Sequence, residues 1–296
     1  MSKSKTIIFS LIVMALWGVL FPLVKMGYEA FGIVSTSDII YFAGFRFTIC
    51  GAAICIYGLI TEKENFKQVK HSVGPVLWSG VFAIILHYSL SYSGLMFTDS
   101  SKTAILKQIG SIFYVCFSWM FFKEDKLTWQ KIAGVILGFG GIIVINTSAA
   151  GVSFGIGEIL IIASSFCYII SNIISKKALT KVSPIAITGC SQLFGGVVLL
   201  IIGKAAGGTM TISFDRSLII MLCICIASIF SYCLWFITVK NGELSKMFII
   251  KFAEPVFASI FGALLLGENI FKIQYLLSFV LIASGIYISN MKKGTS

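Results

Sequence analysis

Charged side chains are scarce in this sequence: only 12% of its 296 residues are Asp, Glu, Lys or Arg, whereas 57% are hydrophobic. A soluble domain contains about 25% charged residues. So few charges cannot cover a surface that faces water, which excludes an ordinary soluble enzyme or binding domain. The surface must face lipid over most of its area, and the sequence therefore predicts a membrane protein.

Motifs that mark cofactor and metal chemistry are also missing. No stretch matches G-x-x-x-x-G-K-[ST], since Gly203-Lys204-Ala205 lacks the hydroxyl residue, so we expect no nucleotide cofactor and no intrinsic ATP drive. The sequence has no H-E-x-x-H, its two histidines lie far apart, and none of its eight cysteines has metal-finger spacing. We expect no metal, and we interpret the cysteines as small packing residues within apolar segments.

The formal net charge of +11 does not indicate a nucleic-acid partner. The lysines lie in short gaps between apolar segments and form no basic face, so loops that flank a lipid bilayer explain them better. Lys3 and Lys5 precede an apolar run from Thr6 to Val24, which is too long for the apolar core of a signal peptide and has no small-x-small cleavage site after it. We predict that this run is retained as the first membrane helix.

Ten apolar stretches are long enough to cross a bilayer, which takes about 20 residues. The gaps between them are short, so we expect no extramembrane domain. The uncharged segment 146–155 is the natural linker, which divides the chain into residues 1–148 and 149–296 with five helices each. The predicted spans are 6–26, 39–60, 74–94, 101–122, 129–146, 156–176, 184–203, 217–239, 246–266 and 272–290.

The distribution of Lys and Arg predicts the orientation in the membrane. If the N-terminus is cytoplasmic, fifteen of these residues fall in cytoplasmic segments and four, Lys102, Lys204, Arg216 and Lys272, fall in outer ones. Positive residues are enriched on the cytoplasmic side. We therefore expect a multi-pass protein of the inner or plasma membrane with both termini in the cytoplasm.

The two halves of the chain repeat each other at a constant offset of 144 residues. Because five helices per half is an odd number, the second half must be inverted relative to the first. A duplicated and inverted apolar chain of this kind is typical of secondary transporters. The matched pairs are Lys102 and Lys246, Lys107 and Lys251, Phe113 and Phe257, Glu124 and Glu268, Gln130 and Gln274, and Gly141 and Gly285.

Several motifs at matching positions of this frame resemble the EamA family of the drug/metabolite transporter superfamily. They are Trp17-Gly18-x2-Phe21-x3-Lys25, Phe45-Arg46-Phe47, Glu254-Pro255-Val256-Phe257, Leu264-Leu265-Leu266-Gly267-Glu268, and the Gly-Gly-Ile-Ile-Val-Ile and Ser-Gly-Ile-Tyr-Ile ends at 140–145 and 284–288. The resemblance covers nearly the whole chain. It implies alternating-access transport, often export, of a small metabolite through a cavity between the halves.

The chain departs from that family in its fourth and ninth helices. Gly110-Ser111 replaces the family's usual proline, and Lys107 and Lys251 are charged where family members usually carry small or polar residues. The substrates of better-known relatives are therefore a poor guide to the substrate of this chain.

Five ionisable residues lie well inside the predicted spans, where a charge costs several kcal/mol and indicates function by default. Lys107 and Lys251 are repeat partners, and a cation on either side of the membrane midplane suits a carboxylate or phosphate. Lys251 has an alternative partner in Glu254 at i+3, whereas Lys107 has no acid within a turn on its own helix. Arg46 is either a third substrate contact or a structural residue bonded to backbone carbonyls or to Glu254.

Two of these residues could couple transport to protons. Glu254 is the single predicted carboxylate near mid-membrane, and His87 has an ordinary pKa of about 6.5, although a packing role for this histidine is the alternative. Aromatic residues could line the cavity, with packing or lipid contact as the alternative. These aromatic residues are Trp17, Tyr88, Tyr92, Phe113, Tyr232, Trp235 and Phe257, among which Tyr88 and Tyr232 are repeat partners.

The resulting prediction is an all-α polytopic membrane protein of ten transmembrane helices in two inverted five-helix repeats. We expect it to transport a small polar metabolite, such as an amino acid or another anionic or zwitterionic compound. Cation or drug efflux by the same fold and a non-transporting membrane scaffold remain alternatives, whereas an intramembrane enzyme lacks a convergent set of catalytic groups. Gly134 and Gly138 allow close helix packing, either within the chain or in a homodimer.

Overall fold

The computed structural model describes residues 2–95, 97, 103, 106–145, 155–211, 216–267 and 273–291, and the regular elements among them are all helices. In chain order they are α1 (Lys3–Phe31), α2 (Thr36–Thr61), α3 (Lys63–Lys67), η1 (Gln68–His71), α4 (Val73–Gly80), η2 (Val81–Leu86), α5 (His87–Leu95), α7 (Gln108–Phe121), α8 (Trp129–Ile145), α9 (Ile156–Ala178), α10 (Pro184–Ala205), α11 (Arg216–Asn241), α12 (Leu244–Ile250), η3 (Lys251–Ala253), α13 (Glu254–Leu266) and α14 (Ile273–Ser289).

Seven helices in the described ranges are long and apolar enough to cross a membrane. Three further apolar helices, Gln108–Phe121, Trp129–Val144 and Ile273–Ser289, are shorter than the predicted spans at the same places. Residues 101, 102, 104, 105, 146 and 272 of these predicted spans lie outside the described residues, as do the linker at 146–154 and Glu268. The all-helical, multi-pass character is confirmed, and ten full-length spans remain a prediction.

Side-chain caps and glycines fix where the helices begin and end. Ser35 and Asp38 form a reciprocal capping box at the start of α2. Gly32 ends α1 and Gly267 ends α13 in the left-handed conformation, which glycine adopts without a steric penalty. Asp38 also accepts a hydrogen bond from the Thr209 amide at 2.7 Å, which holds the turn after α1 against the segment that follows α10.

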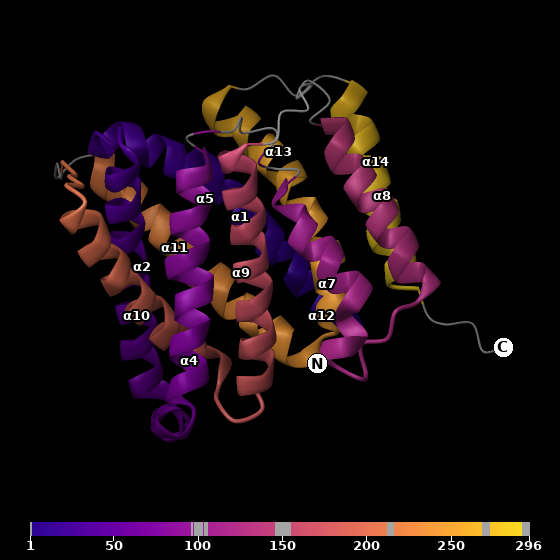
Figure 1. The fold of residues 1–296 in the computed structure, drawn as a ribbon, viewed down its shortest axis with the longest axis horizontal. Coiled ribbons are helices and arrows are strands. Elements are labelled where there is room, and N and C mark those ends of the chain that lie inside the picture. Colours follow the sequence, from indigo (N-terminus) through magenta and orange to yellow (C-terminus); the bar gives the residue numbers. More distant parts are fainter. Residues whose placement is uncertain are drawn as a thin grey trace.

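Two helix pairs form opposite edges of the bundle (Figure 1). At one edge α2 packs along α10, where a Cβ on Gly51 would lie 2.2 Å from the amide nitrogen of Leu193. At the other edge α8 packs along α14, and a Cβ on Gly134 would lie 3.0 Å from the Gly285 carbonyl oxygen. The predicted close-packing glycine face of α8 therefore contacts another helix of the same chain, as small residues at membrane helix interfaces do.

The remaining helices pack between these edges around α1 and α9. Helix α1 contacts α11 and α13, while α9 contacts α4, α5 and α7. The N-terminus, segment Lys63–His71 and the turns before α8, α10 and α12 lie at the lower end in Figure 1. We call this the amino-terminal end, and we call the end where α1 stops at Phe31 the opposite end.

Candidate functional site

A cavity of about 400 Å³ lies among α1, α2, α5, α7, α9, α11 and the α12–η3–α13 segment. Nine of the twelve candidate residues named from the sequence line it, although their roles remain predictions. They are Trp17, Arg46, His87, Tyr88, Tyr92, Lys107, Tyr232, Lys251 and Glu254. Nine further residues complete the lining: Leu20, Phe21, Val24, Lys25, Tyr28, Leu95, Ser111, Ser165 and Tyr168.

The cavity extends from the middle of the bundle towards the opposite end. Its lining residues on α1 begin at Trp17, at the centre of that helix, and continue to Tyr28 near its end. On α5 they reach Leu95, the last residue of that helix. Phe21 and Lys25 are exposed, so they form part of the rim.

Three helices depart from regular α-helical geometry beside this cavity. A 3₁₀ turn at Lys251–Ala253 separates α12 from α13, and Pro255 is the second residue of α13. Lys107 stands in a turn immediately before α7. A π-helical segment, Val81–Leu86, ends immediately before His87. Irregular backbone at membrane depth is tolerated where it is buried in protein or lines a cavity, and π-helical turns are frequent at functional sites.

The ninth predicted helix places one ion pair on the cavity wall. Lys251 Nζ lies 2.8 Å from Glu254 Oε2, so the predicted pair at i+3 is present. The Lys251 ammonium also lies 5.5 Å from the ring centroid of Tyr168 and 6.0 Å from that of Trp17. Lys107 interacts electrostatically with both members of the pair.

Arg46 contributes a buried cation without a carboxylate partner in the described part of the chain. Its side chain is 4% exposed, and the guanidinium carbon lies 4.4 Å from the ring centroid of Phe47 and 6.0 Å from that of Tyr88. Its Nε atom is buried and has no hydrogen bond within the described ranges. The predicted alternative, a bond from Arg46 to Glu254, is not seen among these residues.

The repeat partners Tyr88 and Tyr232 meet in the wall of the cavity. Their hydroxyl oxygens lie 2.7 Å apart and share a hydrogen bond, although the residues are 144 positions apart in the chain. Tyr88 also contacts Tyr92, with ring centroids 5.4 Å apart. A hydroxyl pair of this kind can accept or donate hydrogen bonds towards a polar ligand.

His87 is held by the backbone of α9. Its Nδ1 lies 2.9 Å from the carbonyl oxygen of Ser164, and because a carbonyl can only accept, Nδ1 is the donor. This assignment leaves Nε2 of a neutral ring as an acceptor on the cavity wall. The ring also contacts Tyr168 at a centroid distance of 5.4 Å.

Sequence reasoning missed part of the lining and included residues that lie elsewhere. Lys25 lies at the end of the predicted span 6–26, and Tyr168 lies in an apolar span without a signal that distinguishes it. Trp235 is 1% exposed and donates to Asn172 Oδ1 at 2.7 Å, so it is a core residue. Phe113 and Phe257 are also absent from the cavity lining.

The cavity combines four lysine or arginine residues with one carboxylate. Lys25, Arg46, Lys107 and Lys251 line it together with Glu254. Such a set can bind a carboxylate or phosphate, and Glu254 can bind an ammonium group or a proton. Among the described residues, no group of three or more His, Cys, Asp or Glu side chains is placed to hold a metal ion.

Comparisons with known proteins also indicate a membrane transporter. The family model described as "EamA-like transporter family" matches residues 4–147 and 155–291. "Uncharacterized transporter YvbV" of Bacillus subtilis (strain 168) is 26% identical and covers 98% of this chain and 93% of its own. "S-adenosylmethionine/S-adenosylhomocysteine transporter" of Chlamydia trachomatis serovar L2 is 23% identical, covering 86% and 80%. A solved crystal structure, 17% identical, has a TM-score of 0.81 over 97% of this chain and 96% of that one, which shows the same fold.

Proposed function

The chain belongs to the EamA-like transporter family, and we propose that it is a secondary active transporter, an exporter or exchanger, of a small anionic or zwitterionic metabolite such as an amino acid. The observation that carries this proposal is the charge of the cavity. Arg46, Lys107 and Lys251 line it against the single carboxylate of Glu254. Cations in a low-dielectric site attract a carboxylate or phosphate and disfavour a plain organic cation.

The contacts between helices support an arrangement of two inverted five-helix repeats, in which α7 belongs to the fourth helix of the first repeat. When the two halves are exchanged, the contact of α1 with α11 corresponds to the contact of α9 with α5. In the same way, the contact of α1 with α13 corresponds to the contact of α9 with α7. The pairs α2·α10 and α8·α14, and the hydroxyl pair of Tyr88 and Tyr232, would then lie on the symmetry axis. Transporters with inverted repeats bind substrate between the repeats near the membrane midplane.

A cytoplasmic amino-terminal end is proposed from the positive charges at that end. Single-cysteine labelling in a cysteine-free background tests this sidedness. Position 178 is buried, so the exposed Thr180 in the same turn takes its place beside position 65. We expect cysteines at positions 65 and 180 to react with an impermeant reagent only from the cytoplasmic side. Labelling of either position from outside would overturn the orientation.

Glu254 is the proposed proton carrier, because among the cavity residues it alone has a carboxylate. Glu254→Gln is expected to abolish proton-driven transport while substrate exchange continues, since exchange needs no net proton movement. Transport by proteoliposomes with and without a pH gradient measures both. An equal loss of exchange and net transport would instead make Glu254 a substrate or structural residue.

The ligand class is tested by thermal stabilisation of the purified protein. A ligand at 100 times its dissociation constant stabilises the folded state by about 2.7 kcal/mol. The panel contains amino acids, dicarboxylates, sugar phosphates, organic cations and the two compounds named for the Chlamydia relative. Stabilisation by a carboxylate- or phosphate-containing compound is expected, and it should weaken in Lys107→Gln but persist in Lys204→Gln, which changes an exposed lysine outside the cavity. Stabilisation by organic cations alone would defeat the proposal.

A further inference from the structure

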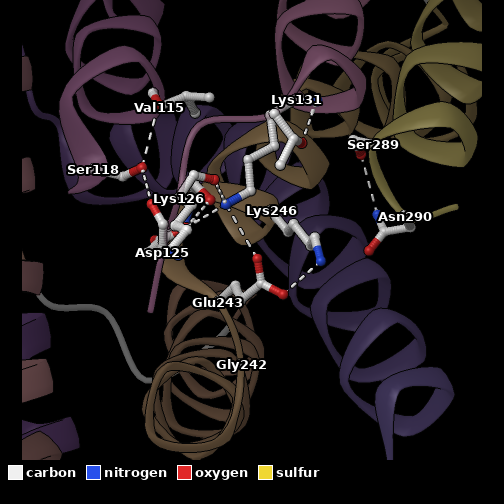
Figure 2. A network of polar contacts seen from close by, with 12 residues as sticks. Val115, Ser118, Asp125, Lys126, Lys131, Gly242, Glu243, Lys246, Ser289 and Asn290 are labelled. Carbon is white, nitrogen blue, oxygen red and sulfur yellow. Dashed lines mark hydrogen bonds and ion pairs between the residues drawn. The ribbon is translucent and has the colours of Figure 1, made fainter. Parts of the chain in front are cut away.

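A buried polar cluster joins the two halves of the chain at the amino-terminal end (Figure 2). Lys131 Nζ lies 2.6 Å from Asp125 Oδ1, 2.7 Å from the Lys126 carbonyl oxygen and 3.1 Å from Glu243 Oε2. Asp125 accepts further hydrogen bonds from the Ser245 amide at 3.0 Å and from the Ser245 hydroxyl. We call Asp125, Lys131, Glu243 and Ser245 the latch.

The Asp125–Lys131 pair of the latch is sheltered from solvent, and the latch spans the boundary between the halves. The side chains of Asp125 and Lys131 are each 1% exposed, and both belong to the turn before α8 and its first residues. Glu243 and Ser245 lie at the start of α12, in the second half of the chain. Charge-assisted hydrogen bonds in a buried network are stronger than exposed ones, so the latch holds these two segments together.

Three fully buried aromatic residues connect the latch to the cavity. Tyr114 donates a hydrogen bond to Asp125 Oδ2 at 3.3 Å, and its ring centroid lies 5.2 Å from that of Phe248. Phe248 in turn lies 6.1 Å from Trp235, which is 5.0 Å from Trp17 in the cavity wall. We call Tyr114, Phe248 and Trp235 the aromatic floor, since each is at most 1% exposed.

These contacts place a continuous barrier on one side of the cavity. The rim at Phe21 and Lys25 is exposed, whereas the path from Trp17 towards the amino-terminal end meets the aromatic floor and then the latch. The floor and latch are built from α7, the turn before α8, the start of α8, α11 and α12, so they include segments of both halves. Any movement that parts these segments must break the bonds of Asp125.

We propose that the latch and the aromatic floor form the gate that closes the cavity towards the amino-terminal end, and that breaking the latch opens it. This inference rests on the proposed transport function, because alternating access requires the cavity to open at that end. Asp125 and Lys131 are then positioning residues that set the balance between the two access states without touching substrate.

The test uses two single-cysteine reporters in a cysteine-free background that remains monodisperse. Val115→Cys reports on the gate, because Val115 is fully buried and follows Tyr114 on α7. Leu95→Cys reports on the other side of the floor, because Leu95 lines the cavity at the end of α5. An impermeant thiol reagent is applied to vesicles from each side in turn. No substrate is needed.

Asp125→Asn keeps the size and an acceptor for Ser245 but removes the charge that holds Lys131. We expect it to raise labelling of Val115→Cys from the amino-terminal side by about tenfold or more, the scale of one charge-assisted hydrogen bond, and to lower labelling of Leu95→Cys from the other side. Tyr114→Phe should act in the same direction but less. Glu64→Gln is the matched control, since it removes an exposed 2.6 Å ion pair with Lys67 at the same end.

Unchanged labelling in both Asp125→Asn and Lys131→Gln would overturn the gate. A rise at both reporters from both sides would also overturn it, since it indicates a loosened fold and not a change of access. If labelling changes as expected but no metabolite binds or is transported, the proposed function is contradicted and the gate is not. If transport is measured and the variants alter neither its rate nor the labelling, the gate is contradicted and the transport function is not.

Discussion

The latch and the cavity both gather charged side chains inside the bundle, but they differ in how those charges are satisfied. In the latch, Lys131 has three oxygen partners and Asp125 has donors from Lys131, Tyr114 and Ser245. In the cavity, Trp17 Nε1 and Arg46 Nε have no hydrogen bond among the described residues, and Arg46 has no carboxylate partner there. Buried polar groups are nearly always paired, so the latch is satisfied within the protein whereas the cavity keeps donors that a ligand can use.

The largest loss of stability is expected from a variant of the latch, whose charges are satisfied within the protein. Lys131→Gln removes the cation between two carboxylates, of which Asp125 is 1% exposed, and an uncompensated buried charge costs about 3–5 kcal/mol. We expect a marked fall in melting temperature without ligand. Lys67→Gln, at an exposed pair of the same end, provides the control and should have little effect. Equal melting temperatures for the two variants would contradict a structural latch.

The second-largest effect is expected in the cavity, where a substitution should lower ligand affinity and leave the stability of the fold intact. Lys107→Gln should weaken binding of an anionic ligand by about 2–3 kcal/mol, or 30- to 150-fold, because one direct charge partner is lost in a low-dielectric site. The melting temperature without ligand should stay unchanged or rise. Ligand titration beside thermal unfolding measures both quantities. Unchanged affinity would show that Lys107 does not contact the ligand, and it would contradict the proposal of an anionic substrate.

Lys251→Gln changes a cavity residue that is also held in an ion pair, so it can affect both the stability of the fold and the site. Its partner Glu254 is buried but not fully sheltered, with 15% of its side chain exposed, and Lys107 still acts on it electrostatically. We therefore expect a loss of stability of about 1–2 kcal/mol, less than for Lys131→Gln. In the double variant with Glu254→Gln, stability should recover, which a double-mutant cycle measures. Additive losses would show that the two side chains act independently.

Much of the fold could be predicted because hydrophobic length is a strong local signal. The expected spans 39–60, 156–176 and 184–203 lie within α2, α9 and α10. The expected helix 246–266 is instead divided by the turn at Lys251–Ala253, and 74–94 contains the π-helical segment Val81–Leu86. Such breaks are stabilised by contacts with neighbouring helices, which the periodicity of one segment does not contain.

The polar residues of the cavity and the latch were likewise predictable only in part. Charge inside an apolar span identified Arg46, Lys107, Lys251 and Glu254, because such charge is rare and costly. The latch was not predicted, since Asp125 stands in a polar turn and Lys131 in the first turn of the following helix, where charges are ordinary. Only the fold brings Asp125 to Ser245, a separation of 120 residues. Tyr168 was missed for a related reason, because one aromatic residue in an apolar helix does not reveal which face meets a cavity.

The smallest effect is expected from Glu243, the exposed member of the latch. Burial alone would raise the pKa of this carboxyl, but hydrogen bonds and charges of Lys246 and Lys131 hold the pKa below its ordinary value. A lowered pKa in the folded state contributes stability above the unfolded value of about 4.3, and this contribution disappears as the pH falls through the folded pKa. With 39% of the side chain exposed, the contribution should be under about 1 kcal/mol. The difference in melting temperature between the unaltered protein and Glu243→Gln should therefore be present at neutral pH, shrink as the pH falls below about 4.3, and vanish only below the lowered folded pKa, where the carboxyl is protonated in both states. Glu64→Gln controls for general effects of acid at the same end. A difference that stayed constant with pH would show that Glu243 stabilises the latch through shape and not through its charge, and Lys131 would then depend on Asp125 alone.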